Sequence, residues 1–342
     1  MDNNNLDSMG IEKSLTLFPE QCLQAWNESS HLSIINNDIQ NVIVCGMGGS
    51  RFTPYTIKFL FKDRINVPYE IVDEYKLPSY ASKKSLVILS SYSGTTEEVL
   101  SCAKDAISKS CQIAAIASGG ELSSLAKENN WTSYIFDPKN NPSGQPRLGA
   151  GYMLMGHTGI LKSYGLVEVE DSEVQEAVRY AKTISQEDLR IKDVFEFMKG
   201  RIISIVGSEH LRGYINGFAN QINENAKAMS DFRVISELNH HLMEGLANPI
   251  IYNKNAGFIF LNSNLYPERI QKRFTLTKEV VEKQGINTYD LKLEGESKLA
   301  QVFEGFVVSG YSTYLLSKHY GVDPIKIPWV DYFKNKLSQP VH

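Results

Sequence analysis

Two glycine- and hydroxyl-rich segments follow apolar, strand-like runs in the first half of the sequence. The first reads VIVCGMGGS over residues 42–50, and the second reads SSYSGTTEE over residues 90–98. Glycines let the backbone approach a ligand, and exposed amides at the start of a following helix attract an anion. A capping box would need one hydroxyl, on Thr95, with Glu98 three residues later. The surplus of hydroxyls instead favours a phosphate held by hydroxyls and amides rather than by lysines.

The glycine segment departs from the dinucleotide fingerprint G-x-G-x-x-G. Gly46 and Gly48 have the required spacing, but Arg51 occupies the position of the third glycine. This departure disfavours a nucleotide-binding oxidoreductase. A tight turn between strand and helix would explain either segment by itself. The prediction therefore rests on the pair, whose loops would face one crevice at the ends of neighbouring strands.

A predicted helix between residues 210 and 230 gathers polar side chains on one face. These side chains, which recur at helical spacing, are Asn216, Asn220, Asn223, Glu224 and Lys227. A solvated face is the ordinary explanation of such a pattern. Asparagine is nevertheless a poor helix former, and surface positions usually carry lysine or glutamate instead. Three asparagines around one glutamate suggest a polar pocket in which Glu224 acts as a general base.

A histidine and an arginine are two further candidates. His240 and His241 follow a predicted strand that ends near Glu237, in a loop or at a helix start. A histidine there can transfer a proton at neutral pH. Adjacent histidines point to different sides and no third ligand has suitable spacing, so no metal site is predicted. Arg147 stands alone before an apolar helix, where a charge that is never lost could stabilise an enediolate; a solvated arginine is the simpler reading.

Alternating strand and helix patterns must position these groups. Strand-like runs occupy residues 41–45, 85–90, 111–117 and 132–136 in the first half, and residues 202–206, 232–235, 258–261 and 288–291 in the second. This alternation is typical of a mostly parallel sheet covered by helices. The length of 342 residues suits two such domains. We expect a first domain over residues 15–166, a helical connector over 167–198 and a second domain over 199–338.

The whole-chain composition excludes several classes of function. The formal net charge of −4 argues against nucleic acid as a partner. No secretory signal opens the sequence, and no apolar run is long enough to cross a bilayer, so a cytoplasmic location is expected. The four cysteines are Cys22, Cys45, Cys102 and Cys111. They lack the spacing of metal ligands and are interpreted as reduced residues, most of them in the core.

These segments together resemble the bifunctional phosphoglucose/phosphomannose isomerases, a branch of the sugar isomerase (SIS) domain proteins. The similarity runs from about Leu17 to Leu337. It includes, in order, LFPEQ, GMGGS, SYSGTTEE, PR before an apolar helix, NENAK, ELNH and GVDP. The resemblance implies an α/β fold of two tandem SIS domains, each a mostly parallel sheet flanked by helices in a three-layer αβα arrangement.

The resemblance also implies a role for each candidate residue. The substrate phosphate would be bound by Gly49, Ser50, Ser91, Ser93 and Thr96. Glu224 would move a proton between C1 and C2 of the open-chain sugar. His240 would assist ring opening, and Arg147 would stabilise the cis-enediolate. A lysine near the C-terminus would contribute as well; Lys334 is our choice, with Lys336 as the alternative.

The implied reaction interconverts glucose 6-phosphate, and mannose 6-phosphate, with fructose 6-phosphate, without metal or other cofactor. The implied assembly is a homodimer in which the partner subunit donates the histidine. Departures from the family pattern are Arg51 and Phe52, expected to narrow the phosphate crevice, together with His241 and the bulky Ile327. A non-catalytic sugar-phosphate sensor and another SIS isomerase are the alternatives. Glu224 and His240 together argue against the sensor.

Overall fold

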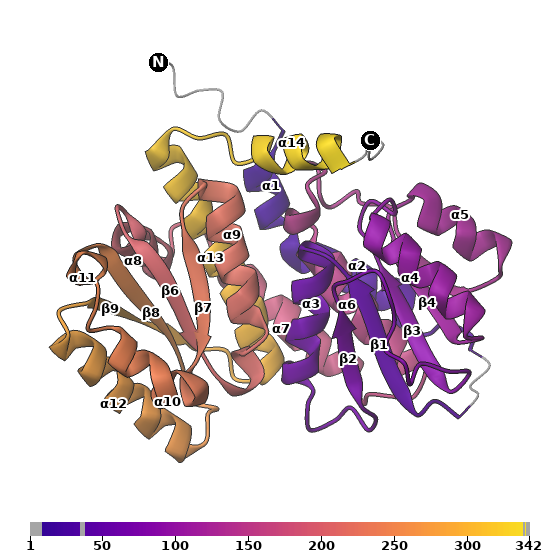
Figure 1. Cartoon of the computed structure of the whole chain (residues 1–342), viewed down its shortest axis with the longest axis horizontal. Coiled ribbons are helices and arrows are strands. Elements are labelled where there is room, and N and C mark those ends of the chain that lie inside the picture. The colour runs from indigo at the N-terminus through magenta and orange to yellow at the C-terminus, as the bar shows by residue number, and fades with distance from the viewer. Residues whose placement is uncertain (1–8, 35–37, 338, 340–342) are drawn as a thin grey trace.

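The computed structural model describes residues 9–34, 38–337 and 339. The chain forms two α/β halves side by side, each built on its own parallel sheet (Figure 1). This confirms the predicted α/β fold class. The segment between the sheets contains helices α7 (Asp171–Thr183) and α8 (Leu189–Met198). The domain limits at residues 166 and 199 remain predictions.

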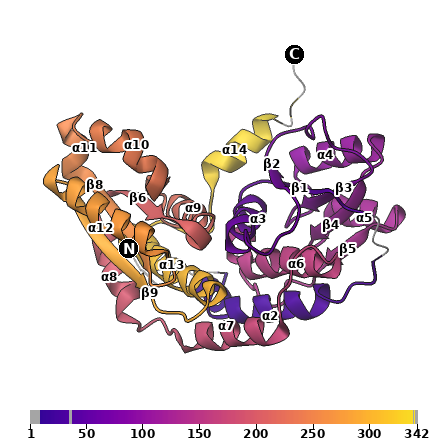
Figure 2. The same ribbon diagram turned by 90° about the horizontal axis from the view of Figure 1, so that it is seen from below.

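The first sheet has the strand order β2-β1-β3-β4-β5, with every pairing parallel. Its strands are β1 (Asn41–Gly46), β2 (Tyr69–Val72), β3 (Ser85–Ser90), β4 (Gln112–Ala117) and β5 (Thr132–Ile135). Helices α2 (Phe18–Ser29), α3 (Gly49–Leu60) and α6 (Ala150–Ser163) cover one face, and α4 (Glu97–Ser108) and α5 (Gly120–Glu128) the other (Figure 2). Because both faces are buried, the central strands are continuously apolar.

The second sheet has the order β7-β6-β8-β9, again fully parallel. Its strands are β6 (Ile202–Gly207), β7 (Ser230–Val234), β8 (Ala256–Ser263) and β9 (Asn287–Leu293). Helices α9 (Tyr214–Ala226) and α13 (Lys298–Tyr320) lie toward the first half, whereas α10 (Ile235–Gly245), α11 (Ile250–Asn255) and α12 (Glu268–Lys283) lie on the outer side (Figure 2).

One hydrophobic core joins the two halves. The ring of Phe306 on α13 lies 6.0 Å from that of Phe52 on α3, 5.4 Å from Phe18 and 4.9 Å from Tyr214. Phe52 is only 1% exposed. The prediction that it narrows the phosphate crevice is therefore wrong, because its ring is part of the core between the halves.

The cysteines and the lengths of the helices can also be compared with the sequence-based expectations. All four cysteines are free; Cys22, Cys45 and Cys102 are buried and Cys111 is half-buried, as expected for reduced residues of the core. Within the described residues, no helix combines the length and the apolar character that a membrane span requires.

Candidate active site

The two predicted loops meet at the carboxyl ends of β1 and β3, which are paired through Gly46 and Ser90. The Ser90 hydroxyl donates to the Ser50 carbonyl oxygen at 3.1 Å, and the Tyr92 amide donates to the Ser50 hydroxyl at 3.1 Å. A side chain on Gly46 would lie 2.3 Å from the same carbonyl oxygen, which explains the glycine. The two loops therefore lie side by side at the same edge of the sheet, as the sequence predicted.

The hydroxyls of the second loop divide into a buried and an accessible group. Ser91 is buried; its hydroxyl lies 2.8 Å from that of Thr96 and accepts a hydrogen bond from the Gly94 amide. Ser93 is exposed and Thr96 is half-buried. Ser50 and Ser91 thus maintain the loop shape, whereas Ser93 and Thr96 can reach a ligand.

Helix α4 begins one residue later than a capping box would require. Its N-cap is Thr96 rather than Thr95, and no side chain caps the helix. The structure therefore does not support the capping box, the alternative explanation of this loop, because the Thr96 hydroxyl bonds to Ser91 instead of the helix backbone. The first-turn amides of a helix have no intrahelical acceptors, so those of α4 can hold an anion.

Gly94 offers a direct test of this loop. Its φ is +72°, and a side chain there would lie 1.9 Å from the Gly119 carbonyl oxygen, which nothing flexible could relieve. We expect Gly94→Ala to weaken the binding of phosphate-bearing ligands at least about tenfold, measured by calorimetry, because the strain displaces Ser93 and Thr96.

Gly48→Ala is the matched control. Gly48 also has a positive φ, +50°, but a side chain there would meet nothing within 4 Å. Because its ψ of −120° lies outside the left-handed helical region, this variant should carry a backbone cost of about 1–3 kcal/mol, but without a clash it should bind more tightly than Gly94→Ala. Equal affinity in the two variants would contradict the role of the Gly94 contact.

Arg147 lies directly beside the first loop. It belongs to the short 3₁₀ turn η2 (Pro146–Leu148), and a side chain on Gly49 would lie 3.7 Å from its Cα. The Arg147 side chain is 4% exposed. Burial lowers the pKa of its guanidinium below the usual value, and the charges of Glu224 and Asp323 oppose that shift. The predicted lone arginine is thus a buried cation rather than a solvated one.

Glu224 is the acidic partner of Arg147. It lies in the last turn of α9, and its Oε2 atom is 3.5 Å from Nη1 of Arg147. The Glu224 side chain is 34% exposed, so a ligand in solvent can approach it. The structure therefore joins two of the predicted catalytic residues, which are far apart in the sequence, and Arg147 places the pair next to the first loop.

An asparagine that the sequence analysis missed completes this cluster. Asn225 is 2% exposed; its Oδ1 atom accepts from Nε of Arg147 at 2.9 Å, and its amide donates to Thr313 at 3.0 Å. It escaped notice because it does not share the polar face of α9. A polar residue among apolar ones in that helix was the available signal.

Two of the three predicted asparagines do not surround Glu224. Asn216 accepts from Nη1 of Arg51 at 3.1 Å, and Asn223 exchanges two hydrogen bonds with the backbone of Ser230. They hold α9 to α3 and to β7, respectively. The predicted pocket of three asparagines is therefore wrong, because hydrogen bonds to neighbouring elements account for two of them.

Arg147 and Lys227 together hold the segment that contains GVDP. Arg147 donates through Nη2 to the carbonyl oxygens of Pro324 and Ile325. Nζ of Lys227 donates to those of Glu224, Asp323 and Pro324 at 2.8, 2.7 and 3.1 Å. Burial and the charge of Arg147 lower the pKa of Lys227 to about 8. The start of the C-terminal segment is thereby attached to the cluster.

Helix α14 (Pro328–Leu337) follows this attachment and lies across the top of the molecule between the halves (Figure 1). None of its side chains is buried. Lys334 and Lys336 are both exposed, and neither forms a hydrogen bond or ion pair with the residues of the cluster that the structure describes. The structure does not choose between the two lysines.

His240 lies away from the cluster of its own chain. β7 ends at Val234 and α10 begins at Ile235, so the predicted strand end near Glu237 is wrong. His240 is the sixth residue of α10 and exposed, not in a loop. Residues 227–234, which include the five residues of β7, lie between α9 and α10, and the strand alone spans about 16 Å at 3.3 Å per residue. The structure does not bring His240 to Glu224 within one chain.

The described residues contain no group of three or more His, Cys, Asp or Glu side chains arranged to hold a metal ion. The polar groups of the two loops and the adjoining cluster are hydroxyls, amides and the Arg147–Glu224 pair. This set suits a phosphorylated, polyhydroxylated ligand, since hydroxyls and amides donate to phosphate oxygens and a carboxylate can accept a proton from carbon.

Comparison with known proteins agrees with this chemistry. The family model described as the bacterial phospho-glucose isomerase C-terminal SIS domain matches residues 187–337. A bifunctional phosphoglucose/phosphomannose isomerase of Caldicellulosiruptor bescii is 30% identical over 96% of this chain and 98% of its own length. Its counterpart in Aquifex aeolicus is 30% identical over 88% of this chain and 91% of its own length.

Solved structures of lower identity share the fold. The tagatose-6-phosphate ketose/aldose isomerase of Escherichia coli is 12% identical, with a TM-score of 0.72 over 93% of this chain and 96% of that one. The C-terminal domain of glucosamine-fructose-6-phosphate aminotransferase from Francisella tularensis is 14% identical, with a TM-score of 0.71 over 92% of this chain and 96% of that one. These similarities show that the fold of the whole chain is shared with these structures.

Proposed function

The chain belongs to the bifunctional phosphoglucose/phosphomannose isomerase family, and from this premise we propose that it interconverts glucose 6-phosphate and mannose 6-phosphate with fructose 6-phosphate. One observation carries the proposal. A partly exposed carboxylate, Glu224, lies 3.5 Å from the buried guanidinium of Arg147, which in turn lies beside the first of the two hydroxyl-bearing loops. A base, a fixed positive charge and a phosphate site are the groups that this reaction needs.

Substrate binding begins with the phosphate. In this proposal Ser93, Thr96 and the first amides of α4 bind the phosphate oxygens, while Ser50 and Ser91 keep the two loops together. A phosphate bound at this end fixes the register of the sugar chain, so that C1 and C2 lie toward Glu224. No lysine is needed for the phosphate, because hydroxyls and helix amides supply the donors.

Proton transfer follows at Glu224. The Glu224 carboxylate, 3.5 Å from Nη1 of Arg147, is the group that accepts the proton. The carboxylate takes the proton from C2, acidified by the carbonyl at C1, and returns it to C1 of the enediolate. Arg147 supplies positive charge near the developing oxyanions. Both epimers can use one base if the C2–C3 bond rotates between the steps, and no metal is required.

Ring opening requires an acid near the ring oxygen, and we assign this role to His240 of a second copy. Within one chain the strand β7 lies between His240 and Glu224. A homodimer that places α10 of each copy at the crevice of the other would supply the imidazole. The exposed position of His240 supports this assignment, since the described part of its own chain leaves the side chain accessible to a second copy. Lys334 remains the proposed C-terminal contributor.

The test is turnover of the purified protein with glucose 6-phosphate and with mannose 6-phosphate in the presence of a chelator. We expect fructose 6-phosphate from both sugars at rates that the chelator leaves unchanged. Formation of fructose 6-phosphate from only one of the two sugars would restrict the substrate specificity to that sugar. It would point to the bulky segment around Ile327 as the cause. Binding of fructose 6-phosphate without turnover of either sugar would instead identify a sensor.

A further inference from the structure

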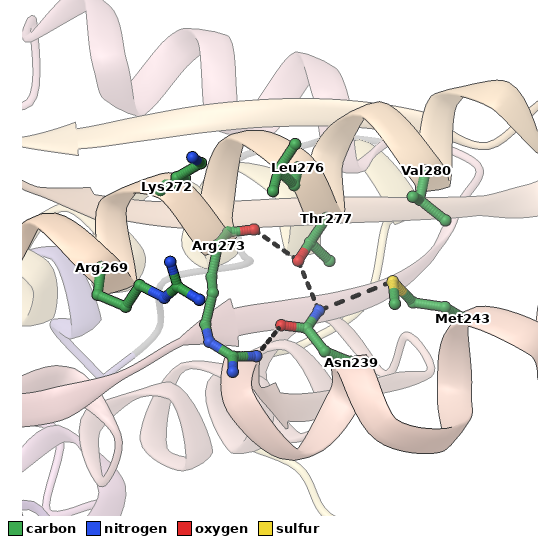
Figure 3. A pocket seen from close by; sticks show the side chains of 8 residues that line it. All are labelled: Asn239, Met243, Arg269, Lys272, Arg273, Leu276, Thr277 and Val280. Carbon is green, nitrogen blue, oxygen red and sulfur yellow. Dashed lines mark hydrogen bonds between the residues drawn. The ribbon is translucent and has the colours of Figure 1, made fainter.

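A groove between α10 and α12 lies on the outer side of the second half (Figure 3). Its volume is about 400 Å³, and its apolar surface comes from Met243, Leu276 and Val280. Asn239 braces the groove: its amide donates to Thr277 at 2.7 Å, and its Oδ1 atom accepts from Arg273 at 2.9 Å. The groove is thus a preformed apolar depression between two packed helices.

Three cations border this groove. Arg269, Lys272 and Arg273 all come from the first turns of α12 (Figure 3). None of them is within ion-pair distance of an acidic residue in the part of the chain that the structure describes. Exposed cations beside apolar surface can stack on aromatic rings. The groove therefore suits an aromatic, apolar occupant.

Helix α14 is an aromatic surface without such a partner in its own chain. The exposed fractions of Trp329, Tyr332 and Phe333 are 83%, 60% and 61%. Residues three and four apart share one side of a helix, so these rings form a single ridge. A helix normally packs its apolar stripe against a core, and an exposed cluster of this kind marks an interaction surface.

The aromatic ridge of α14 and the α10–α12 groove lie at opposite ends of the folded molecule. Helix α14 crosses the top of the molecule, where Arg147 and Lys227 hold its preceding segment, and α10 and α12 lie at the bottom of the second half (Figure 1). One chain cannot bring them together. We propose that α14 of one copy docks into the α10–α12 groove of a second copy.

The choice of α14 as the helix that occupies the groove follows from the geometry of the proposed reaction, on which this inference rests. His240 lies on α10 beside Asn239 of the groove. When α10 enters the crevice of a second copy, it approaches the Arg147–Glu224 cluster, and α14 of that copy starts from the same cluster. The groove and α14 of different copies are thus brought together. A two-fold axis makes the contact twice and closes the dimer.

The contact is chemically complementary. The rings of α14 would fill the depression formed by Met243, Leu276 and Val280, and methionine sulfur packs favourably on aromatic rings. Arg269 and Lys272 would cover the ring faces. Each copy contributes one aromatic ridge and one groove, so neither surface stays exposed.

Site-specific cross-linking tests the contact in the full-length protein. One copy carries Leu337→Cys on α14, which leaves all three rings in place, and a differently tagged copy carries Leu276→Cys in the groove. Both positions are about half exposed, 48% and 51%. Both chains also carry Cys111→Ser, because Cys111 is partly exposed and could react with the maleimide. The other native cysteines are buried and stay unchanged. A short bismaleimide should join the two tags covalently.

The matched control replaces Leu276→Cys with Leu189→Cys, on α8. Leu189 is 73% exposed, so its thiol is at least as accessible, but it lies outside the groove. It should give no cross-linked product with Leu337→Cys. Equal cross-linking at the two positions would reject the groove as the docking site.

A second variant measures the contribution of the rings. Trp329→Ser combined with Phe333→Ser alters only exposed side chains, so the fold should persist. We expect the dissociation constant of the dimer to rise at least about thirtyfold, measured by sedimentation. The docking is overturned if the wild-type chain is monomeric. It is also overturned if the double serine variant leaves the dissociation constant unchanged and the cysteine variants give no cross-link. An active dimer without the cross-link rejects the docking but leaves the isomerase proposal. A cross-linked dimer without turnover supports the docking but rejects the isomerase proposal.

Discussion

Glu224→Gln is expected to lower kcat for both sugar phosphates by about 10³-fold while leaving their KM nearly unchanged. Glutamine has the shape of glutamate but cannot accept the C2 proton. The phosphate loops, which determine binding in this proposal, do not contact Glu224. The fold should persist, because the side chain is 34% exposed and Arg147 keeps its bonds to Gln145, Asn225, Pro324 and Ile325.

The measurement is steady-state formation of fructose 6-phosphate, together with exchange of solvent deuterium into the sugar. Both should fall in parallel, because both need transfer of the same proton. Glu121→Gln, an exposed glutamate in the first turn of α5, is the matched control and should behave like the wild type. If Glu224→Gln retains more than about a tenth of kcat, another residue is the base.

A mixture of His240→Asn and Glu224→Gln chains should recover activity that neither variant has. Each single variant disables every site of its own dimer. In the mixed dimer, one site combines an intact Glu224 with an intact His240 from the other copy, and the second site lacks both. Random exchange makes half of the dimers mixed, so about a quarter of the wild-type activity should return.

Subunit exchange must be verified by mass, with the two variants carrying different tags. His241→Asn serves as the control for His240→Asn, because it is adjacent and exposed and pairs only loosely with Glu237 at 3.7 Å. It should remain active without mixing. Mixed dimers without recovered activity would show that His240 and Glu224 act within one chain, and the cross-subunit site would be rejected.

Local sequence was sufficient for most strands and for the positions of the two strand-to-helix loops, whose role in phosphate binding stays a prediction. Strands such as Ser85–Ser90 are recognisable because both of their faces are buried, which requires a continuous apolar run. The edge strand β2 was missed because it has four residues and exposes Glu70. The loops were identifiable because each consists of consecutive residues with the composition that a strand-to-helix turn at an anion site requires.

The partners of the functional side chains were decided only by the tertiary structure. Arg147 is 78 residues from Asn225 and 177 from Pro324 along the chain, and the packing of α9 and α13 brings them together. Periodicity identifies which helix face a residue occupies, but not which element that face meets. The role of Glu224 as the base stays a prediction. Periodicity overlooked Asn225 and grouped Asn216 and Asn223 wrongly, because hydrogen bonds between distant segments depend on the complete fold.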